Sequence, residues 1–141
     1  MKLQLFTVEE ANQLLPDVRR RVERLVARKR EFVRLESRMG ILLMATAGAA
    51  PDNPDALELR SLGEKRRRLG ESIGRGVQEL HDMGAIAKDL ERGLVDFYAL
   101  AGDRLVFLCW QLGEPEVAHW HTLEGGFATR QQIKEAGLDG P

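Results

Sequence analysis

Two long runs of apolar residues at heptad-like spacing, separated by one short loop, restrict this chain to a fold built on paired helices. The first run lies in residues 8–39 and the second in residues 56–83. Such spacing places the apolar side chains on one face of a helix that packs along another helix. Residues 45–55 contain two prolines and turn-forming Asp and Asn, which predicts a short loop and an antiparallel hairpin. The apolar positions are Ala11, Leu15, Val18, Val22, Leu25, Phe32 and Met39, then Leu59, Leu62, Leu69, Ile73, Val77 and Leu80.

The first helix has a clear start and an ambiguous end. Thr7 followed by Glu10 forms a capping box, which predicts the N-terminus of a helix. Pro16 lies inside the pattern and should kink the helix or separate its first two turns, because proline has no N–H and its ring clashes with the preceding turn. Gly40 is a candidate C-cap, and residues 41–44 offer an alternative in which the helix continues.

The second helix is expected from about Ala56 to Met83, with Gly84 ending it as the residue after the C-cap. Its interior is unusually rich in glycine, and each glycine costs up to about 1 kcal/mol relative to alanine in a helix. Either the helix is locally soft at these positions or another part of the chain comes close. The glycines are Gly63, Gly70, Gly74 and Gly76.

After Gly84 the apolar period changes from that of a helix to that of a strand. Residues 94–100 and 105–111 alternate around the sequence Gly102-Asp103, which predicts a β-hairpin with a two-residue turn. Residues 86–89 can add a third short strand. The fold class is therefore α+β: a long antiparallel helical hairpin with a small antiparallel β-sheet, containing the hairpin 94–111, at the C-terminal end. The turn pairs Ala101 with Arg104, Tyr98 with Phe107 and Asp96 with Cys109.

The hairpin has two unequal faces. One face is entirely apolar and should pack on the core: Val95, Phe97, Ala99, Val106, Leu108 and Trp110. The other face is largely apolar but includes Asp96 and Cys109, so it also needs cover, for which the segment after Gly113 is available.

Length and composition indicate one soluble domain. At 141 residues, with 43% hydrophobic and 30% charged residues, the chain can bury a core without disulfides. We expect a helical hairpin over about 7–83, a β-rich acidic block over about 84–133 and a flexible tail over 134–141. The single cysteine, the absence of a membrane-spanning apolar run and the early Glu9 and Glu10 predict a cytoplasmic protein.

The charge distribution does not favour nucleic-acid binding. Residues 1–83 hold 16 Lys and Arg against 13 Asp and Glu, whereas residues 84–141 hold 5 against 9. Binding to phosphate backbones requires a basic patch. The basic run at 65–68 is flanked by Glu64 and Glu71 at helical spacing, so we expect a solvated helix face there.

The residues able to bind a metal or move a proton are concentrated in the last third of the chain. A carboxylate at Asp96, among apolar neighbours, needs hydrogen bonds, a charged partner or a metal. His119 and His121 share one side of an extended segment and could reach one ion, and Glu114 and Glu116 have the same spacing. Two histidines and a carboxylate, with Asp96 or Cys109 as a further ligand, match the nitrogen, oxygen and sulfur ligands of zinc or a related divalent metal. Alternatively, Asp96 is held by ordinary hydrogen bonds, one histidine packs beside Trp120 and Cys109 is a small core residue.

Several short motifs follow one another in order along the chain. Those near the start are Phe6-Thr7, Glu9-Glu10-Ala11-Asn12 and Leu14-Leu15-Pro16; those of the C-terminal block are Lys88-Asp89-Leu90, Gly93-Leu94-Val95-Asp96-Phe97, Leu108-Cys109-Trp110, Leu112-Gly113-Glu114, Trp120-His121, Gly125-Gly126-Phe127 and Arg130. In this order they resemble a family of bacterial proteins, domain of unknown function 2203. The resemblance implies no activity. It marks Asp96, Cys109, Glu114, His121 and Arg130 as motif positions and favours them over His119 and Glu116.

Two functions follow as hypotheses. The first is a binding or interaction module that self-associates as a dimer, or binds a protein partner, through its long helices and carries a metal site. The alternative is a metal-dependent hydrolase in which Asp96, Glu114 and His121 bind the metal, or Glu114 acts as the general base. Arg130 would then orient an anionic group of the substrate.

Overall fold

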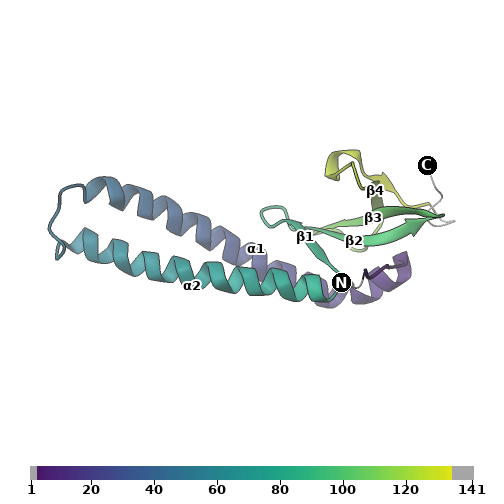
Figure 1. The fold of residues 1–141 in the computed structure, drawn as a ribbon, viewed down its shortest axis with the longest axis horizontal. Helices are drawn as coiled ribbons and strands as arrows, with labels where there is room; N and C mark the ends of the chain where they lie inside the picture. Colours follow the sequence, from purple (N-terminus) through teal and green to yellow (C-terminus); the bar gives the residue numbers. More distant parts are fainter. Residues whose placement is uncertain (1–2, 135–141) are drawn as a thin grey trace.

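The computed structural model describes residues 3–134 and has the predicted α+β fold. Helix α1 (Val8–Ala45) and helix α2 (Pro54–Asp82) form a long antiparallel hairpin, and a five-stranded antiparallel sheet follows them. Figure 1 shows the sheet at the end of the hairpin where α1 begins and α2 ends. The expected flexible tail, apart from Lys134, lies outside the described residues.

Helix α1 begins as predicted but ends later. The Thr7 hydroxyl accepts from the Glu10 N–H, and the Glu10 carboxylate accepts from the Thr7 N–H. The helix continues through Pro16, and its first turns lie at an angle to the remainder (Figure 1). Of the two ends that the sequence left open, the structure has the later one. Leu42 is buried in the hairpin, and the helix is capped not at Gly40 but at Thr46, which donates its N–H and hydroxyl to the Leu42 carbonyl.

The four glycines inside helix α2 differ in how close the side chains of α1 come. A Cβ atom at position 76 would lie 2.6 Å from Cδ2 of Leu25, and one at position 70 would lie 3.4 Å from the Phe32 ring. A Cβ at position 63 would make an ordinary contact with Met39, whereas one at position 74 would meet nothing within 4 Å. Close approach of α1 side chains therefore accounts for Gly76 and Gly70. Gly84 ends the helix with φ of +93°.

The sheet contains the predicted hairpin in the predicted register. Strands β1 (Ile86–Asp89), β2 (Leu94–Ala101), β3 (Arg104–Gln111), β4 (His119–Thr122) and β5 (Gln131–Gln132) lie side by side in chain order. Asp96 pairs with Cys109 and Ala101 with Arg104, around a turn in which Gly102 has φ of +64°. The short 3-10 helix η1 (Phe127–Thr129) separates β4 from β5.

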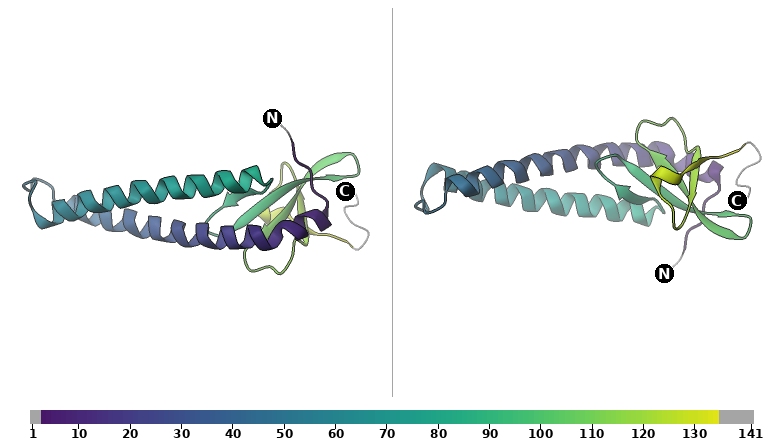
Figure 2. Two further views of the ribbon diagram at one scale, coloured as in Figure 1. Left: turned by 90° about the horizontal axis from the view of Figure 1, so that it is seen from below. Right: turned by 90° about the horizontal axis from the view of Figure 1, so that it is seen from above.

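The core lies between α1 and one face of the sheet. The buried α1 side chains from Ala11 to Val26 and Leu80 of α2 form one cluster with the predicted apolar face of β2 and β3. Phe97, Leu108 and Trp110 at its centre are fully buried. Figure 2 shows the sheet lying across the N-terminal half of α1, so this half of the helix positions the strands.

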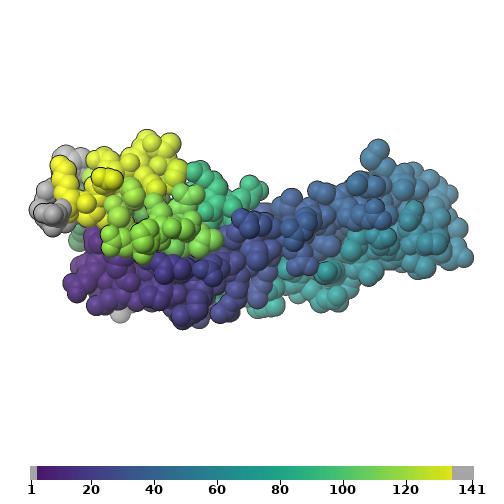
Figure 3. Space-filling model, turned by 180° about the vertical axis from the view of Figure 1, so that it is seen from behind, coloured from purple at the N-terminus to yellow at the C-terminus, as the bar shows by residue number. Residues whose placement is uncertain are grey.

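The outer part of the helical hairpin projects as a narrow arm, visible in the space-filling view of Figure 3. Among the described residues of α2, only Leu80 is buried. The other predicted apolar positions of α2 are half-buried, because each helix of a two-helix arm is covered on one side only. Ion pairs join the helices, among them Lys65 with Glu31 at 3.1 Å and Arg66 with Glu36 at 2.8 Å. Within α2, Arg67 pairs with Glu64 and Glu71, and Arg68 pairs with Glu64. Carboxylates therefore neutralise the basic side chains of residues 65–68.

The second sheet face is covered by the segment after β4. Figure 1 shows this yellow segment on the opposite side of the sheet from α1. Leu123, Gly125, Gly126 and Phe127 face Leu94, Asp96, Phe107 and Cys109 across a small cavity. The cover expected from residues after Gly113 is therefore present.

Candidate metal centre

Three neighbouring strands bring Asp96, Cys109 and His121 to one point on the covered face. Asp96 of β2 pairs with Cys109 of β3, and His121 of β4 pairs with Phe107, two residues from Cys109 on the same face. The exposed fractions of Asp96, Cys109 and His121 are 3%, 2% and 4%. One carboxylate oxygen, the thiol sulfur and one imidazole nitrogen all lie within 4.8 Å of one another.

The hydrogen bonds of His121 define the direction of its ring. Nδ1 lies 2.8 Å from the carbonyl oxygen of Thr122, and Nε2 lies 3.0 Å from Oδ2 of Asp96. A carbonyl oxygen only accepts, so Nδ1 carries a proton and donates it. If neither Nε2 nor Oδ2 carried a proton, the lone pairs of the two atoms would repel each other. Either one proton or a cation therefore lies between them. Burial raises the pKa of Asp96 above its usual value, although His121, the Cys109 thiol and Lys88 act to lower it.

Cys109 is held as a thiol in this environment. Burial and the neighbouring Asp96 carboxylate raise its pKa to about 12, against the weaker opposing effect of Arg130. Both ring nitrogens of His121 are engaged, so neither is placed to accept the thiol proton. The group therefore lacks the cysteine–histidine contact of a thiol nucleophile and its base. A divalent cation is the species that would convert this thiol into a thiolate ligand.

A cavity of about 130 Å³ opens beside the three side chains. Its walls are largely apolar and include Leu94, Phe107 and Phe127, and Lys88 lies at its edge. The Lys88 ammonium lies 4.6 Å from the centroid of the Phe107 ring. Phe127 is held in place by Arg92 and Arg130, whose guanidinium carbons lie 4.1 and 4.3 Å from its ring centroid.

Glu114 lies in an adjacent cluster with Arg130 rather than in the group of three. The two side chains form a bidentate pair with N–O distances of 2.9 and 2.6 Å, and Glu114 also accepts from the Gln111 N–H at 2.7 Å. Burial opposes ionisation of Glu114, but these hydrogen bonds prevail and lower its pKa below the usual value. Nη1 of Arg130 is 4.0 Å from the Cys109 sulfur, which links the two clusters. Nδ1 of His119 is buried and lies 3.6 Å from Glu114 without a hydrogen bond among the described residues.

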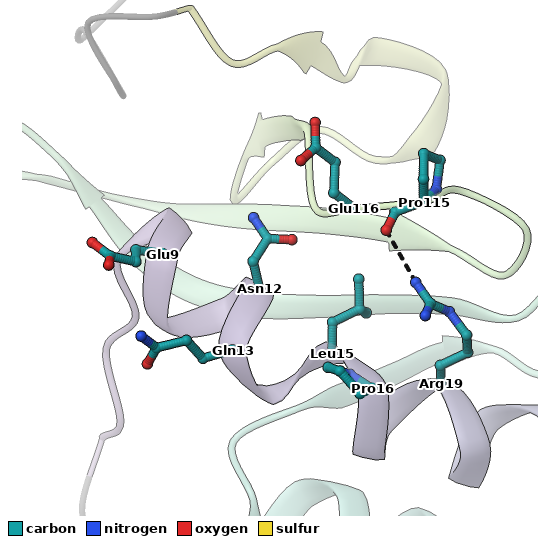
Figure 4. Close-up of a pocket in the computed structure, with 8 residues that line it drawn as sticks. All are labelled: Glu9, Asn12, Gln13, Leu15, Pro16, Arg19, Pro115 and Glu116. Atoms are coloured by element: carbon teal, nitrogen blue, oxygen red, sulfur yellow. Dashed lines mark hydrogen bonds between the residues drawn. The ribbon is translucent and has the colours of Figure 1, made fainter.

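Glu116 does not line the cavity beside Asp96, Cys109 and His121. Figure 4 shows it among the residues that line a pocket of about 510 Å³ together with the first turns of α1. Arg19 closes one end of this pocket by donating to the Pro115 carbonyl at 3.1 Å. Of the six side chains predicted as ligands, the structure thus brings together Asp96, Cys109 and His121.

The comparisons with known proteins place the chain in a family. The model of a family described as "Uncharacterized conserved protein (DUF2203)" matches residues 4–133. The chain belongs to the DUF2203 family. The resemblance inferred from the motifs is thereby confirmed, and the match spans all three side chains of the group. No curated protein and no solved structure matches the chain.

Two residues of this DUF2203 site were not predicted from the sequence. Lys88 reaches the cavity because the pairing of β1 with β2 shifts register between Ala87 and Asp89, an irregularity without a local sequence signature. Phe127 belongs to the Gly125-Gly126-Phe127 motif of the family resemblance, but nothing in the sequence indicated that its ring lies over the sheet. Among residues 3–134, no helix is long and apolar enough to cross a membrane.

Proposed function

We propose that this chain is a metal-binding module in which Asp96, Cys109 and His121 bind one divalent ion of the zinc class, and that it self-associates through its helical hairpin. The observation that carries the metal site is the convergence of three different ligand atoms within 4.8 Å at a buried position. A tetrahedral zinc ion, with bonds of about 2.0–2.3 Å, holds its ligand atoms about 3.3–3.6 Å apart. Small side-chain movements would close the difference.

The surroundings of His121 support this proposal. A histidine that binds a metal commonly donates its other ring N–H to a backbone carbonyl or carboxylate, which orients the ring. Nδ1 of His121 makes such a contact with Thr122, and Nε2 faces Asp96. The set of one sulfur, one nitrogen and one oxygen suits zinc or a similar transition metal rather than magnesium or calcium, which prefer oxygen ligands.

The far end of the helical arm supports self-association. Residues 40–51 contain no charged side chain. Within them Ile41, Leu43 and Met44 expose 59%, 61% and 83% of their surface, and Leu57 of α2 exposes 49%. Apolar side chains gathered at one exposed place commonly mark a contact surface. A second copy of the same arm offers a matching surface.

The alternative function, a hydrolase with Glu114 as general base, has less support from the geometry. A general base must have an oxygen available to accept a proton from the attacking water. Both carboxylate oxygens of Glu114 already accept from Arg130, and one also accepts from Gln111. These contacts favour a role for Glu114 in holding Arg130 beside Cys109.

Elemental analysis of untagged protein, purified without chelator, tests the metal site. We expect near-stoichiometric zinc or another transition metal in the wild type, loss of metal in His121→Ala, and weaker but retained binding of added zinc in the nearly isosteric Cys109→Ser. His81→Ala is the matched control, because His81 is exposed on α2. Circular dichroism of each variant would show that the fold is retained. Wild-type protein that stays metal-free after supplementation would mean that Asp96 and His121 form a structural hydrogen-bonded pair.

A further inference from the structure

A metal ion bound to Asp96, Cys109 and His121 would lie beside a small cavity. All three side chains line it, so an ion bound to them would face the cavity with its remaining coordination position. Three protein ligands with one open position are typical of zinc sites that bind an exchangeable ligand, whereas structural sites use four protein ligands. The volume of about 130 Å³ is well below the roughly 300 Å³ at which pockets for larger organic ligands begin, so the ligand is a molecule of few atoms.

The charges around the cavity favour an anionic ligand. The Asp96 carboxylate and a metal-bound Cys109 thiolate together neutralise a divalent ion. A further anion on the metal would leave one uncompensated negative charge at a buried position. Lys88 lies at the edge of the cavity and has no carboxylate within 4.0 Å among the described residues. Its ammonium is therefore available to compensate that charge, whereas the Arg130 guanidinium is already paired with Glu114.

The backbone around Lys88 is a second, independent observation. The register of β1 against β2 shifts between Ala87 and Asp89, with Lys88 between them. Bulges of this kind redirect a side chain and occur frequently beside functional sites. As a result, the Lys88 ammonium lies over the Phe107 ring, which lines the cavity.

We infer that this cavity binds a small monocarboxylate, with its carboxylate between the metal ion and Lys88 and its short alkyl group against Phe107, Leu123 and Phe127. The inference rests on the proposed metal site. The apolar walls favour an alkyl carboxylate over phosphate, which has no apolar part to bury. The small volume excludes nucleotides and sugar phosphates.

Cobalt(II) spectroscopy tests this inference and the metal site separately. Cobalt bound to Cys109 gives a thiolate charge-transfer band, and its d–d bands respond to a ligand in the open position. Acetate, propionate and inorganic phosphate are titrated into cobalt-loaded wild type, Lys88→Gln, Lys88→Arg and the matched control Lys65→Gln, whose side chain lies on the helical arm.

We expect both carboxylates to change the d–d bands saturably, and propionate to bind about fourfold more tightly because it buries one more methylene group. Phosphate should bind more weakly than acetate. Lys88→Gln should weaken carboxylate binding by about tenfold or more, because a charge-assisted contact is lost, while Lys88→Arg and Lys65→Gln retain it.

Two other outcomes would overturn the inference in distinguishable ways. In the first outcome the thiolate band is present, but the d–d bands do not change when a carboxylate is added, or they change equally in wild type and Lys88→Gln. This result would support the metal site and exclude the carboxylate site. Absence of the thiolate band in wild-type protein would remove both.

Discussion

At the scale of single residues, Asn12 joins the first turns of α1 to the chain between β3 and β4. Its Nδ2 donates to the carbonyls of Val8 and Val117, and its Oδ1 accepts from the Val117 N–H at 2.7 Å. The side chain thus pairs with both backbone groups of Val117, which is 1% exposed. The segment that leads into β4, and therefore the placement of His121, depends on this contact.

Replacing Asn12 by alanine should destabilise the protein by about 2 to 3 kcal/mol, because it leaves the buried N–H and carbonyl of Val117 unpaired. Chemical denaturation measures the change in the free energy of unfolding. Gln13→Ala is the matched control, since Gln13 is the exposed neighbour on the same helix and should change stability by less than about 0.5 kcal/mol. Equal effects of the two variants would contradict the role assigned to Asn12.

The protonation of the metal-free site predicts the proton balance of metal binding. Cys109 carries a proton at neutral pH because its pKa is raised to about 12, and the contact between Nε2 of His121 and Asp96 holds a second one. One divalent ion should therefore release roughly two protons at pH 7, since metal ligands bind in their deprotonated forms. Calorimetry in buffers of different ionisation enthalpy measures this number. Cys109→Ser should release about one proton, and a wild-type release near zero would disagree with the site as described.

At the scale of secondary-structure elements, Gly76 and Gly74 provide a matched pair on α2. A Cβ at position 76 would clash with Leu25, which is 1% exposed and packed in the core, whereas one at position 74 would point into open space. Gly76→Ala should therefore destabilise the protein by about 1 to 2 kcal/mol through overpacking. Gly74→Ala should stabilise it by up to about 1 kcal/mol through helix propensity. Thermal or urea unfolding distinguishes them, and stabilisation by both substitutions would show that the helices are not closely packed at Leu25.

The elements differ in how far the sequence predicts them. The register of β2 against β3 follows from alternation around Gly102-Asp103, and this alone placed Asp96 opposite Cys109. The pairing of β4 with β3 has no such local determinant: it depends on Asn12 and on a connection of seven residues, 112–118. The sequence therefore indicated His121 as a candidate ligand but not its contact with Asp96. It also predicted Glu114 as a ligand, whereas the bidentate contact with Arg130 arises only when residues 16 positions apart are brought together.

At the scale of the whole molecule, the proposed metal site and the proposed surface for self-association lie in different parts: the first in the sheet and the second at the end of the helical arm. The buried polar cluster lies in the sheet, whereas the exposed apolar residues Ile41, Leu43, Met44 and Leu57 lie at the far end of the arm that projects in Figure 3. Metal binding and self-association are therefore expected to be separable by substitution.

Leu43→Glu combined with Met44→Glu should convert a self-associating protein into a monomer, because it places charges on the most exposed apolar side chains of the arm. Sedimentation over a range of concentrations up to high micromolar measures the equilibrium. Leu100→Glu is the control, since Leu100 is 47% exposed at the end of β2, away from the arm. Metal content should be the same in all three proteins. A wild type that stays monomeric throughout would exclude this mode of association.

One metal ion should bind to Asp96, Cys109 and His121 together. X-ray absorption at the zinc edge, on protein loaded with one equivalent of zinc, tests it most directly because it reports the atoms bound to the metal. We predict one sulfur at about 2.3 Å with nitrogen and oxygen atoms at about 2.0–2.2 Å, and loss of the sulfur in Cys109→Ser. A wild-type shell made only of nitrogen and oxygen would contradict the account, as would a sulfur that persists in the variant.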